Sequence, residues 1–360
     1  MFNNLLKDLY IAVDYKRSAA ALNHTLRLGS NAAKGALVLM LYRLEPHSGG
    51  LRNTARIANA LSAHLSKTLL LYIQCHSKQD QLLVQEYGFN GSVITDLPHS
   101  ADLFVTTSFI FSLSLSDLLA QTKDRWIHII QDYDELFFPV STRYYHAAKV
   151  KSGPEAFIAS GKWMKLPGKT VYLPFPVDVG IYHTDAAIQK SRDIDLLFFH
   201  KPELPRRCAL LCEQIAAVLL KKQPDLRIAF YGSTLSKWLT RASVQHLGAL
   251  PSLSALADIY RRSKIGVSLN LTNPSLIPFE HMACGCLPVS PYVDIPEEFH
   301  LPGIHVDGTL NQLSNHILGL LQQPSLETRA LDLYRSYSDQ GYLCTKEQFD
   351  SVIARTVGTL

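Results

Sequence analysis

The sequence predicts an α/β protein with two doubly wound parallel-sheet domains that face a central cleft. Three observations support this fold class. The chain has 360 residues, which is too long for one small core. Short apolar runs alternate with helical patterns, as in parallel sheets covered on both faces. The alternation stops at the proline-punctuated stretch Leu173–Asp178 and then restarts. We therefore divide the chain into residues 1–178, 179–338 and 339–360.

The first domain is predicted from five apolar runs and the helical stretches between them. A glycine pair follows the first run, and the next helical pattern places Ile57, Leu61 and Leu65 on one face. Strand, glycine turn and helix form a βα unit of the nucleotide-binding kind, although one glycine pair is a weak signal alone. The predicted elements are strands Ala36–Tyr42, Thr68–Cys75, Asp102–Thr106, Trp126–Ile130 and Phe157–Ala159, with a helix over Phe109–Gln121.

The second domain repeats the pattern after the linker. Its first helix is predicted to begin at Pro205 and to end with Lys221 and Lys222, as the helix dipole prefers. The predicted strands are Ile194–Phe199, Arg227–Tyr231, Ile265–Leu269 and Leu287–Ser290, and the predicted helices are Pro205–Lys222, Ala255–Arg262, Phe279–Cys284 and Lys346–Val357.

Composition bounds the partners and the location. A hydrophobic content of 47% and a charged content of 18% describe a globular protein. A net charge of +4 is too weak to indicate nucleic acid, but it suits an anionic substrate or membrane surface. The six cysteines lack zinc-site spacing and are expected to be buried thiols. Without a signal peptide or a membrane helix, the protein is expected in the cytoplasm. Residues 1–34 are a weakly helical segment that could contact the membrane peripherally.

Three basic residues follow the first strand of the second domain. Lys201, Arg206 and Arg207 lie just past the carboxyl end of Ile194–Phe199, where open α/β sheets bind their ligands. Arginines at a helix start oppose the helix dipole unless an anion is bound there. The alternative is a solvated pair held by Glu203 or Glu213. We favour an anion site because of the position.

A second candidate stretch runs from Pro274 to Val289. It offers small polar residues, two prolines and the carboxylate of Glu280, which is the only acid between Asp258 and Asp294. Strand, loop and helix start with one carboxylate form a usual cradle for a nucleotide, in which N–H groups meet phosphate and the acid meets sugar hydroxyls. Glu280 could also be an ordinary first-turn acid. We favour the binding role because the flanking prolines and Gly285 indicate a fixed backbone.

Acidic residues follow the strand Trp126–Ile130 directly. Asp132 and Asp134 could hold a divalent cation against a diphosphate, or one of them could be the general base of an acceptor site. A capped polar turn is the third interpretation, and it is common for such sequences. A three-residue DxD pattern is weak alone. Near the first strand, His47 and Ser48 precede Gly49 and Gly50, whose backbone a ligand can approach closely. His47 is a candidate catalytic residue, with a plain solvated histidine as the alternative.

These stretches together resemble the GT-B glycosyltransferases, and glycosyltransferase family 4 in particular. Its donor signature has two glutamates eight positions apart, of which Glu280 matches the second, while Thr272 stands at the first. A bacterial subgroup of rhamnosyltransferase-like enzymes of surface polysaccharide synthesis is more similar still. The motifs that carry this resemblance are Ser48-Gly49-Gly50, Gln131-Asp132-Tyr133-Asp134 with Phe137-Phe138-Pro139, Ala159–Trp163, Lys201-Pro202 with Arg206-Arg207, and Ser275–Glu280.

The resemblance implies where substrates bind. A nucleotide-sugar donor, with dTDP-L-rhamnose the leading candidate, would sit mainly on the second domain. A glycan or lipid-linked acceptor would sit on the first, near Gln131 and Tyr133. The final helix would cross back to the first domain. The donor residues implied are Gly49, Gly50, Lys201, Arg206, Arg207, Gly248, Leu250, Ser275, Leu276, Ile277 and Glu280.

The implied chemistry is sugar transfer without a cofactor or a metal. Cations and N–H groups would stabilise the leaving nucleoside diphosphate. Asp132 or Asp134 would serve as the base if the enzyme inverts, and the leaving phosphate could take the proton if it retains. Three alternatives stay open at this point: a metal-dependent transferase built on Asp132 and Asp134, a sugar-nucleotide epimerase, and a non-catalytic binding subunit suggested by Thr272.

Overall fold

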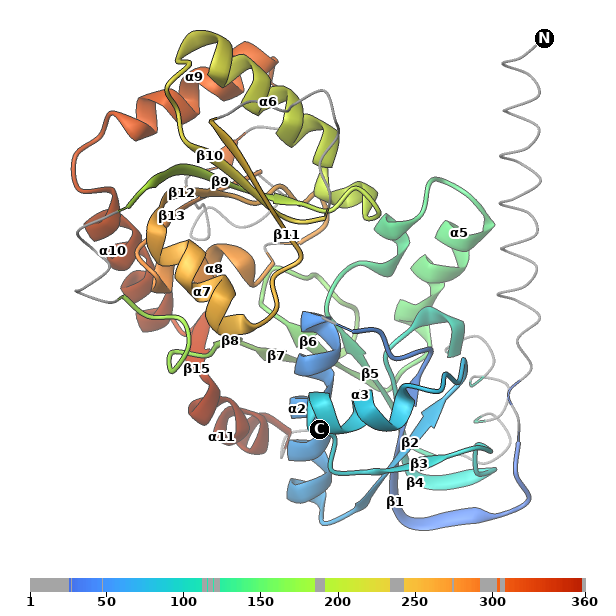
Figure 1. The fold of residues 1–360 in the computed structure, drawn as a ribbon. Helices are drawn as coiled ribbons and strands as arrows, with labels where there is room; N and C mark the ends of the chain where they lie inside the picture. Colours follow the sequence, from blue (N-terminus) through green and yellow to red (C-terminus); the bar gives the residue numbers. More distant parts are fainter. Residues whose placement is uncertain are drawn as a thin grey trace, which may run out of the picture. The chain divides into compact units, whose positions relative to one another are not determined.

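Two large parallel sheets, each with its own helices, and one small two-stranded sheet make up the described part of this computed structural model (Figure 1). The structure describes residues 26, 28–46, 48–111, 115, 119, 124–184, 192–233, 243–273, 275–291, 303–304 and 308–357. The chain divides into unit 1, Met1–Leu173 with Asp350–Leu360, and unit 2, Pro174–Phe349. Most of the expected helix in residues 1–34 lies outside the described residues, but the described residues 32–34 belong to a strand and not to a helix. The boundaries drawn from the sequence, after residues 178 and 338, stay predictions.

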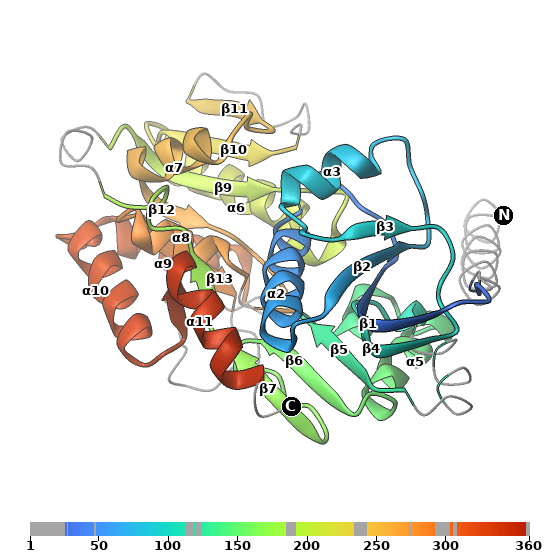
Figure 2. The same cartoon turned by 90° about the horizontal axis from the view of Figure 1, so that it is seen from below.

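Unit 1 contains a seven-stranded sheet in the order β3-β2-β1-β4-β5-β6-β7, and all the paired strands are parallel. Helix α2, Gly49–Leu65, begins at the cap Ser48 and packs on helix α3, Asp80–Tyr87 (Figure 2). Short elements η1, Asp134–Phe137, α5, Thr142–Lys149, and η2, Val150–Ser152, connect β5 to β6. The strands are β1 Ala32–Leu41, β2 Thr68–Ile73, β3 Ser92–Ile94, β4 Ser100–Thr106, β5 Trp126–Ile130, β6 Ala156–Ser160 and β7 Lys169–Leu173.

The core of unit 1 explains why its strands read as continuous apolar runs. Residues 36–41 of β1 and all of β5 are buried, because helices or loops cover both faces of the sheet. One apolar cluster joins Val38 and Met40 of β1 with Phe104 of β4, and Phe111 and Leu115 cover it. The strand order reverses between β1 and β4, so the carboxyl ends of these strands flank a switch point where ligands bind in open α/β sheets.

Unit 2 repeats this plan with a six-stranded sheet in the order β11-β10-β9-β12-β13-β14. Helices α6, Ala209–Lys222, and α9, Leu310–Leu321, cover one face, and α7, Leu253–Arg262, and α8, Ile277–Ala283, cover the other (Figure 1). The strands are β9 Ile194–His200, β10 Ile228–Gly232, β11 Val244–Gly248, β12 Ser263–Val267, β13 Leu287–Pro291 and β14 Gly303–Ile304.

Unit 2 also contains a small two-stranded sheet. Strand β8, Phe175–Val177, pairs in parallel with β15, Leu343–Thr345, and helix α10, Leu326–Asp339, lies between α9 and β15 in the chain. The stretch that the sequence assigns to a linker therefore contains a strand. Helix α11, Lys346–Val357, follows β15 directly, and unit 1 includes its residues from Asp350 onward.

One predicted helix is wrong at its start. The helix expected over Pro205–Lys222 is a 3₁₀ turn, η4, at Pro205–Arg207, followed by Cys208 and then α6. Cys208 has φ = +50°, a left-handed conformation that breaks the helical hydrogen-bond ladder. The predicted helix over Phe109–Gln121 falls largely outside the described residues, although residues 109–111 are helical. The other predicted strands and helices are present, with ends shifted by a few residues.

Candidate functional site

The switch point of unit 2 lies between β9 and β12, where the strand order reverses. Two loops leave the carboxyl ends of these strands: residues 201–208 after β9 and residues 268–276 after β12. In open α/β sheets this crevice is the usual ligand site, because two loops diverge from neighbouring strands there. Lys201, Arg206 and Arg207 all lie in the first loop, and Ser275 and Leu276 in the second.

Arg207 joins the two loops. Its Nη1 and Nη2 atoms donate to Oγ of Ser275 over 3.3 and 3.4 Å. The backbone N–H of Leu271 also donates to the carbonyl of Arg206 over 3.1 Å. Ser275 has φ = +63°, so the loop is held in a left-handed conformation that non-glycine residues rarely adopt. The structure thus brings together two motifs that are separated by about 70 positions in the sequence.

The arginines do not lie on the first turn of α6. They are on η4, and Cys208 separates them from the helix. The expectation that a helix dipole opposes them is therefore wrong, and their position at the switch point remains the reason to assign them to an anion. The acids suggested as alternative partners have other contacts. Glu203 accepts from Ser233 Oγ over 2.6 Å, and Glu213 Oε1 lies 2.8 Å from His200 Nε2.

Glu280 lies within α8 and is almost fully buried. Its charge and that of Arg207 both act on the hydroxyl of Tyr231, whose pKa is raised chiefly by burial. Tyr231 ends the buried part of β10, and its hydroxyl lies 3.0 Å from that of Tyr260 in α7. The carboxylate, carried by α8, and the guanidinium, carried by η4, therefore both lie near Tyr231.

Two aromatic residues of this edge were not among the predicted site residues. The Phe199 and Tyr231 rings lie side by side on β9 and β10, with centroids 5.2 Å apart. The Arg207 guanidinium carbon lies 5.2 Å from the Phe199 ring centroid, at a distance typical of cation–π contacts. In the sequence each of these residues looks like a core residue at the end of an apolar run, so the local pattern does not mark either of them as a site residue.

Thr272 is buried in the loop after β12. Its Oγ1 lies 3.4 Å from Asn270 Oδ1, and Asn270 donates to the carbonyl of Asn273 over 2.9 Å. Thr272 is only 3% exposed and Asn270 only 2%. The position that the donor signature described above assigns to a first glutamate is thus occupied by a neutral, tightly packed polar group.

Gly248 and Leu250 lie on the same sheet edge as the arginine loop. Gly248 ends β11 with φ = +61°, and no atom within 4 Å would meet a Cβ there. β11 is two strands away from β9, so this turn is displaced sideways from Lys201.

Unit 1 brings a second set of predicted residues together. Gly49 and Gly50 begin α2, whose cap Ser48 accepts from the N–H of Leu51 over 3.3 Å. Gln131, which follows β5, donates through Nε2 to the carbonyl of Gly50 over 2.9 Å and to Thr54 Oγ1 over 3.0 Å. The glycine turn and the Gln131–Asp134 segment therefore form one edge of the unit 1 sheet. His47, the remaining predicted residue here, lies outside the described residues.

Asp132 and Asp134 differ in environment. Asp132 is buried, and its Oδ1 accepts from the N–H of Tyr133 over 2.8 Å. Asp134 accepts from the N–H of Phe109 over 3.3 Å. Burial, together with the negative charge of Asp132, raises the pKa of Asp134 to about 7. A carboxyl that titrates near neutrality can accept a proton at physiological pH, which suits a general base.

Tyr133, between the two acids, is fixed on several sides. Its hydroxyl accepts from the N–H of Lys165 over 2.7 Å, and its ring meets that of Trp163 edge-on, with centroids 5.4 Å apart. Lys151 Nζ lies 4.2 Å from the ring centroid and also pairs with Glu135. This packing holds the backbone of the acidic segment.

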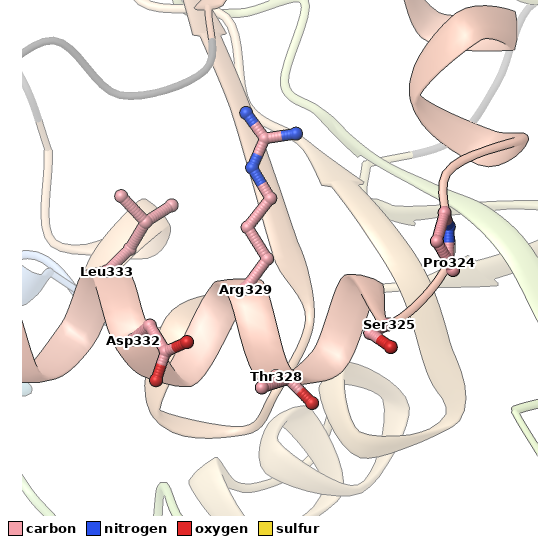
Figure 3. Close-up of a pocket in the computed structure, with 6 residues that line it drawn as sticks. All are labelled: Pro324, Ser325, Thr328, Arg329, Asp332 and Leu333. Atoms are coloured by element: carbon pink, nitrogen blue, oxygen red, sulfur yellow. The ribbon is translucent and has the colours of Figure 1, made fainter.

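We find weaker candidates for a functional site in the other parts of the described chain. No group of three or more histidine, cysteine, aspartate or glutamate residues within the described ranges has the geometry of a metal site. A shallow pocket along α10 is lined by residues of that helix and the turn before it, and Figure 3 shows Arg329 pointing away from Ser325 and Thr328. None of the predicted site residues lines it.

Comparisons with known proteins bear on both units. Residues 194–296 match the family model described as WsaF, C-terminal domain. This range is less than half of the chain, and it contains Lys201, Arg207, Ser275 and Glu280. No curated protein sequence matches the chain.

Several solved structures are similar over nearly the whole chain. HepE from Anabaena, in complex with UDP-glucose, is 14% identical with a TM-score of 0.68, covering 90% of this chain and 100% of that one. Sucrose-phosphate synthase from Thermosynechococcus elongatus is 14% identical with a TM-score of 0.63, covering 90% and 97%. A glycosyltransferase from Rickettsia africae is 14% identical with a TM-score of 0.61, with the same coverage. The chain has the GT-B fold. The predicted fold class is confirmed, and within this GT-B fold the edge that carries Arg207 belongs to the C-terminal unit.

Proposed function

We propose that this chain is a glycosyltransferase that moves a sugar from a nucleotide-activated donor to an acceptor hydroxyl. The GT-B fold, the similarity of residues 194–296 to the WsaF C-terminal domain and the UDP-glucose complex of the similar HepE support this activity. We assign the donor to the switch point of unit 2 and the acceptor to the edge of unit 1 that carries Gln131, Tyr133 and Asp134.

The contact between Arg207 and Ser275 carries the proposal. It joins the basic loop after β9 to the loop after β12, so cationic side chains meet small polar groups at the ligand-binding edge of the sheet. Such an arrangement fits a diphosphate, because guanidinium groups bind phosphate oxygens through paired, charge-assisted hydrogen bonds. Glu280, from the other side, suits the hydroxyls of the nucleoside sugar.

The chemistry follows from these groups. As the glycosidic bond to the donor breaks, negative charge grows on the diphosphate, and Lys201, Arg206 and Arg207 stabilise it. This role needs no metal ion, and full activity in excess chelator would be consistent with it. On the acceptor side, Asp134 takes the hydroxyl proton in an inverting reaction, with a pKa near the working pH.

The finer assignments rest on the sequence motifs. We propose L-rhamnose, carried by dTDP, as the leading donor sugar, and a glycan or lipid-linked glycan as the acceptor. The neutral pair Thr272 and Asn270 suits a sugar that needs no carboxylate partner at that point. We place the reaction in the cytoplasm, as the sequence predicts.

Calorimetric titration with a panel of nucleotide sugars tests the donor site. Arg207→Met should weaken binding of the preferred donor by about 10- to 100-fold, since a hydrogen bond to a charged group contributes about 1.5–3 kcal/mol. Arg335→Met is the matched control, because Arg335 is exposed on α10 and forms an ion pair with the exposed Asp332. The control should bind normally.

Two results would overturn the assignment. One is unchanged donor affinity in Arg207→Met and Glu280→Gln variants that keep the wild-type circular dichroism. The other is a wild-type protein that binds no member of the panel. Donor hydrolysis or transfer, measured on the same samples, separates an enzyme from a subunit that only binds.

A further inference from the structure

The segment after the acidic residues of unit 1 exposes an unusual amount of apolar surface. Leu136 and Phe137 of η1 are 44% and 41% exposed, Val140 is 92% exposed, and Tyr145 of α5 is 57% exposed. These four are half of the eight large hydrophobic side chains that are exposed in the described part of the chain. Single exposed apolar residues are ordinary, but a local group of them indicates an interaction surface.

The group is held in place by packing beneath it. Phe138, between the exposed residues, meets the Phe109 ring edge-on, with centroids 5.5 Å apart. It packs on a small core that contains Ala147 and Val150. Ser141 caps α5 by accepting from the N–H of Tyr144 over 3.3 Å. The exposed side chains therefore project from an anchored segment.

Positive charge surrounds these apolar side chains. The Arg143 guanidinium carbon lies 4.6 Å from the Phe138 ring centroid, and Lys149 Nζ lies 5.4 Å from that of Tyr145. No acid occurs from Leu136 to Pro154. Over residues 136–172 the charge is +5, from Arg143, Lys149, Lys151, Lys162, Lys165 and Lys169 against Glu155, while the whole chain carries +4. This one stretch therefore accounts for the basic character of the protein.

We propose that Leu136, Phe137, Val140, Arg143, Tyr145 and Lys149, here called the η1–α5 surface, bind the face of an anionic lipid bilayer. Apolar and aromatic side chains would enter the headgroup boundary, and the cations beside them would meet lipid phosphates. Within the described residues no helix is long and apolar enough to cross a bilayer, so this contact is peripheral.

The composition of the surface favours a bilayer over a protein partner. Lysine is depleted at protein–protein interfaces, whereas lysine and arginine beside aromatic residues are typical of surfaces that lie on anionic membranes. The near acid, Glu135, is buried and pairs with Lys151, so it does not oppose anionic lipids. The inference does not depend on the proposed sugar transfer, because none of the six residues is assigned to the donor or acceptor site.

Sedimentation with lipid vesicles tests the proposal on the full chain. We expect binding to vesicles of phosphatidylcholine with 30% phosphatidylglycerol, weak binding to phosphatidylcholine alone, and weakening by salt. Lys149→Ala should lower the partition coefficient about fivefold, the effect of one positive charge near an anionic surface. Val140→Ser should lower it about tenfold through lost apolar burial.

Matched controls lie elsewhere in unit 1. Leu82, 64% exposed on α3, and Lys78, exposed just before that helix, give the variants Leu82→Ser and Lys78→Ala. Both should bind vesicles like the wild type. All four variants should keep the wild-type affinity for the nucleotide-sugar donor, or the wild-type melting temperature if no donor is found.

Three outcomes would overturn the proposal. The wild-type protein could fail to bind anionic vesicles, the η1–α5 variants could bind as well as the wild type, or the controls could lose binding equally. A dimer that forms through this surface, seen by ultracentrifugation together with absent vesicle binding, would count against it in the same way.

Discussion

At the scale of single residues, the fold shifts the protonation of Asp134 into the neutral pH range. It lies beside the buried Asp132, and it accepts a hydrogen bond from the N–H of Phe109. Burial and the neighbouring charge favour the neutral acid, which raises its pKa to about 7 from an ordinary 3.8. A raised pKa also has a cost in stability that can be measured without knowing any substrate.

The sign of that cost follows from proton linkage. A carboxyl with a raised pKa holds its proton more tightly in the native state, so its contribution favours folding in acid and is lost as pH rises through about 7. Asp134→Asn should therefore be about 2 kcal/mol more stable than the wild type at pH 8 and nearly equal to it at pH 4. Urea unfolding at the two pH values measures the difference.

Asp102→Asn is the control for this prediction. Lys67 donates a hydrogen bond to Asp102 and lowers its pKa, so this variant should lose stability at pH 8 and recover in acid, which is the opposite sign. An equal effect of Asp134→Asn at both pH values would contradict the environment described for Asp134.

Some site residues could be named from the sequence and others could not. Lys201, Arg207 and Glu280 stand out because charges are rare beside buried strands. Phe199 and Tyr231 look like core residues, since each ends an apolar run, and only the strand order shows that the two runs are neighbours. The break at Cys208 was also hidden, because nothing in its local sequence signals a positive φ for a cysteine.

At the scale of elements, β12 and α8 pack closely where Gly266 faces His281. A Cβ on Gly266 would lie 2.3 Å from the ring of His281. His281 is fully buried, its ring meets Tyr260 edge-on with centroids 4.3 Å apart, and burial lowers its pKa to about 3. The neutral imidazole thus fills the space that a side chain would take, and it fixes the helix that carries Glu280.

Gly266→Ala should therefore destabilise the protein by about 1–3 kcal/mol through overpacking. His281→Ala should cost stability by itself, but the double variant should be less unstable than the sum of the two single effects by at least about 1 kcal/mol. Urea unfolding of the three variants gives this coupling directly.

Gly319→Ala provides the comparison. Gly319 is exposed within α9, and nothing lies within 4 Å of its added Cβ, so alanine there should stabilise by about 0.5–1 kcal/mol. Additive effects of Gly266→Ala and His281→Ala would show that the two positions do not share one space.

The sequence predicts the long buried strands correctly, but it does not predict some of the very short strands. The sequence predicts β5 and β9 correctly because all or nearly all of their residues are buried and most of them are apolar. β3 and β14 were missed, since strands of two or three residues give no period to read. The sequence assigns β8 to a linker because the central residue of this strand is proline, which is tolerated here in a strand of a two-stranded sheet.

At the scale of the whole molecule, each unit has its own sheet and its own core. A donor that binds unit 2 should therefore stabilise unit 2 against opening without an equal effect on unit 1. At 100 times the dissociation constant, hydrogen exchange of the slowest amides in β9, β10 and β12 should slow by about 100-fold.

Hydrogen-exchange mass spectrometry with and without the nucleotide measures the exchange rate of each peptide and so tests this prediction. The amides of β1, β4 and β5 serve as the internal control, and their rates should change far less. Equal slowing in both sheets would mean that the chain unfolds as one cooperative body.

The left-handed conformation of Cys208 makes the orientation of the basic loop, residues 201–207, independent of the orientation of helix α6. In an unbroken helix, each residue added or removed ahead of α6 would rotate the arginines by about 100° around its axis. Here the 3₁₀ turn ends before Cys208 and α6 begins at Ala209. Residues 201–207 therefore form a segment that can be exchanged without changing the ends of β9 or α6. If the proposed donor site is correct, chimaeras that exchange this segment among GT-B proteins should change the affinity for the donor diphosphate while leaving the core of the unit unchanged.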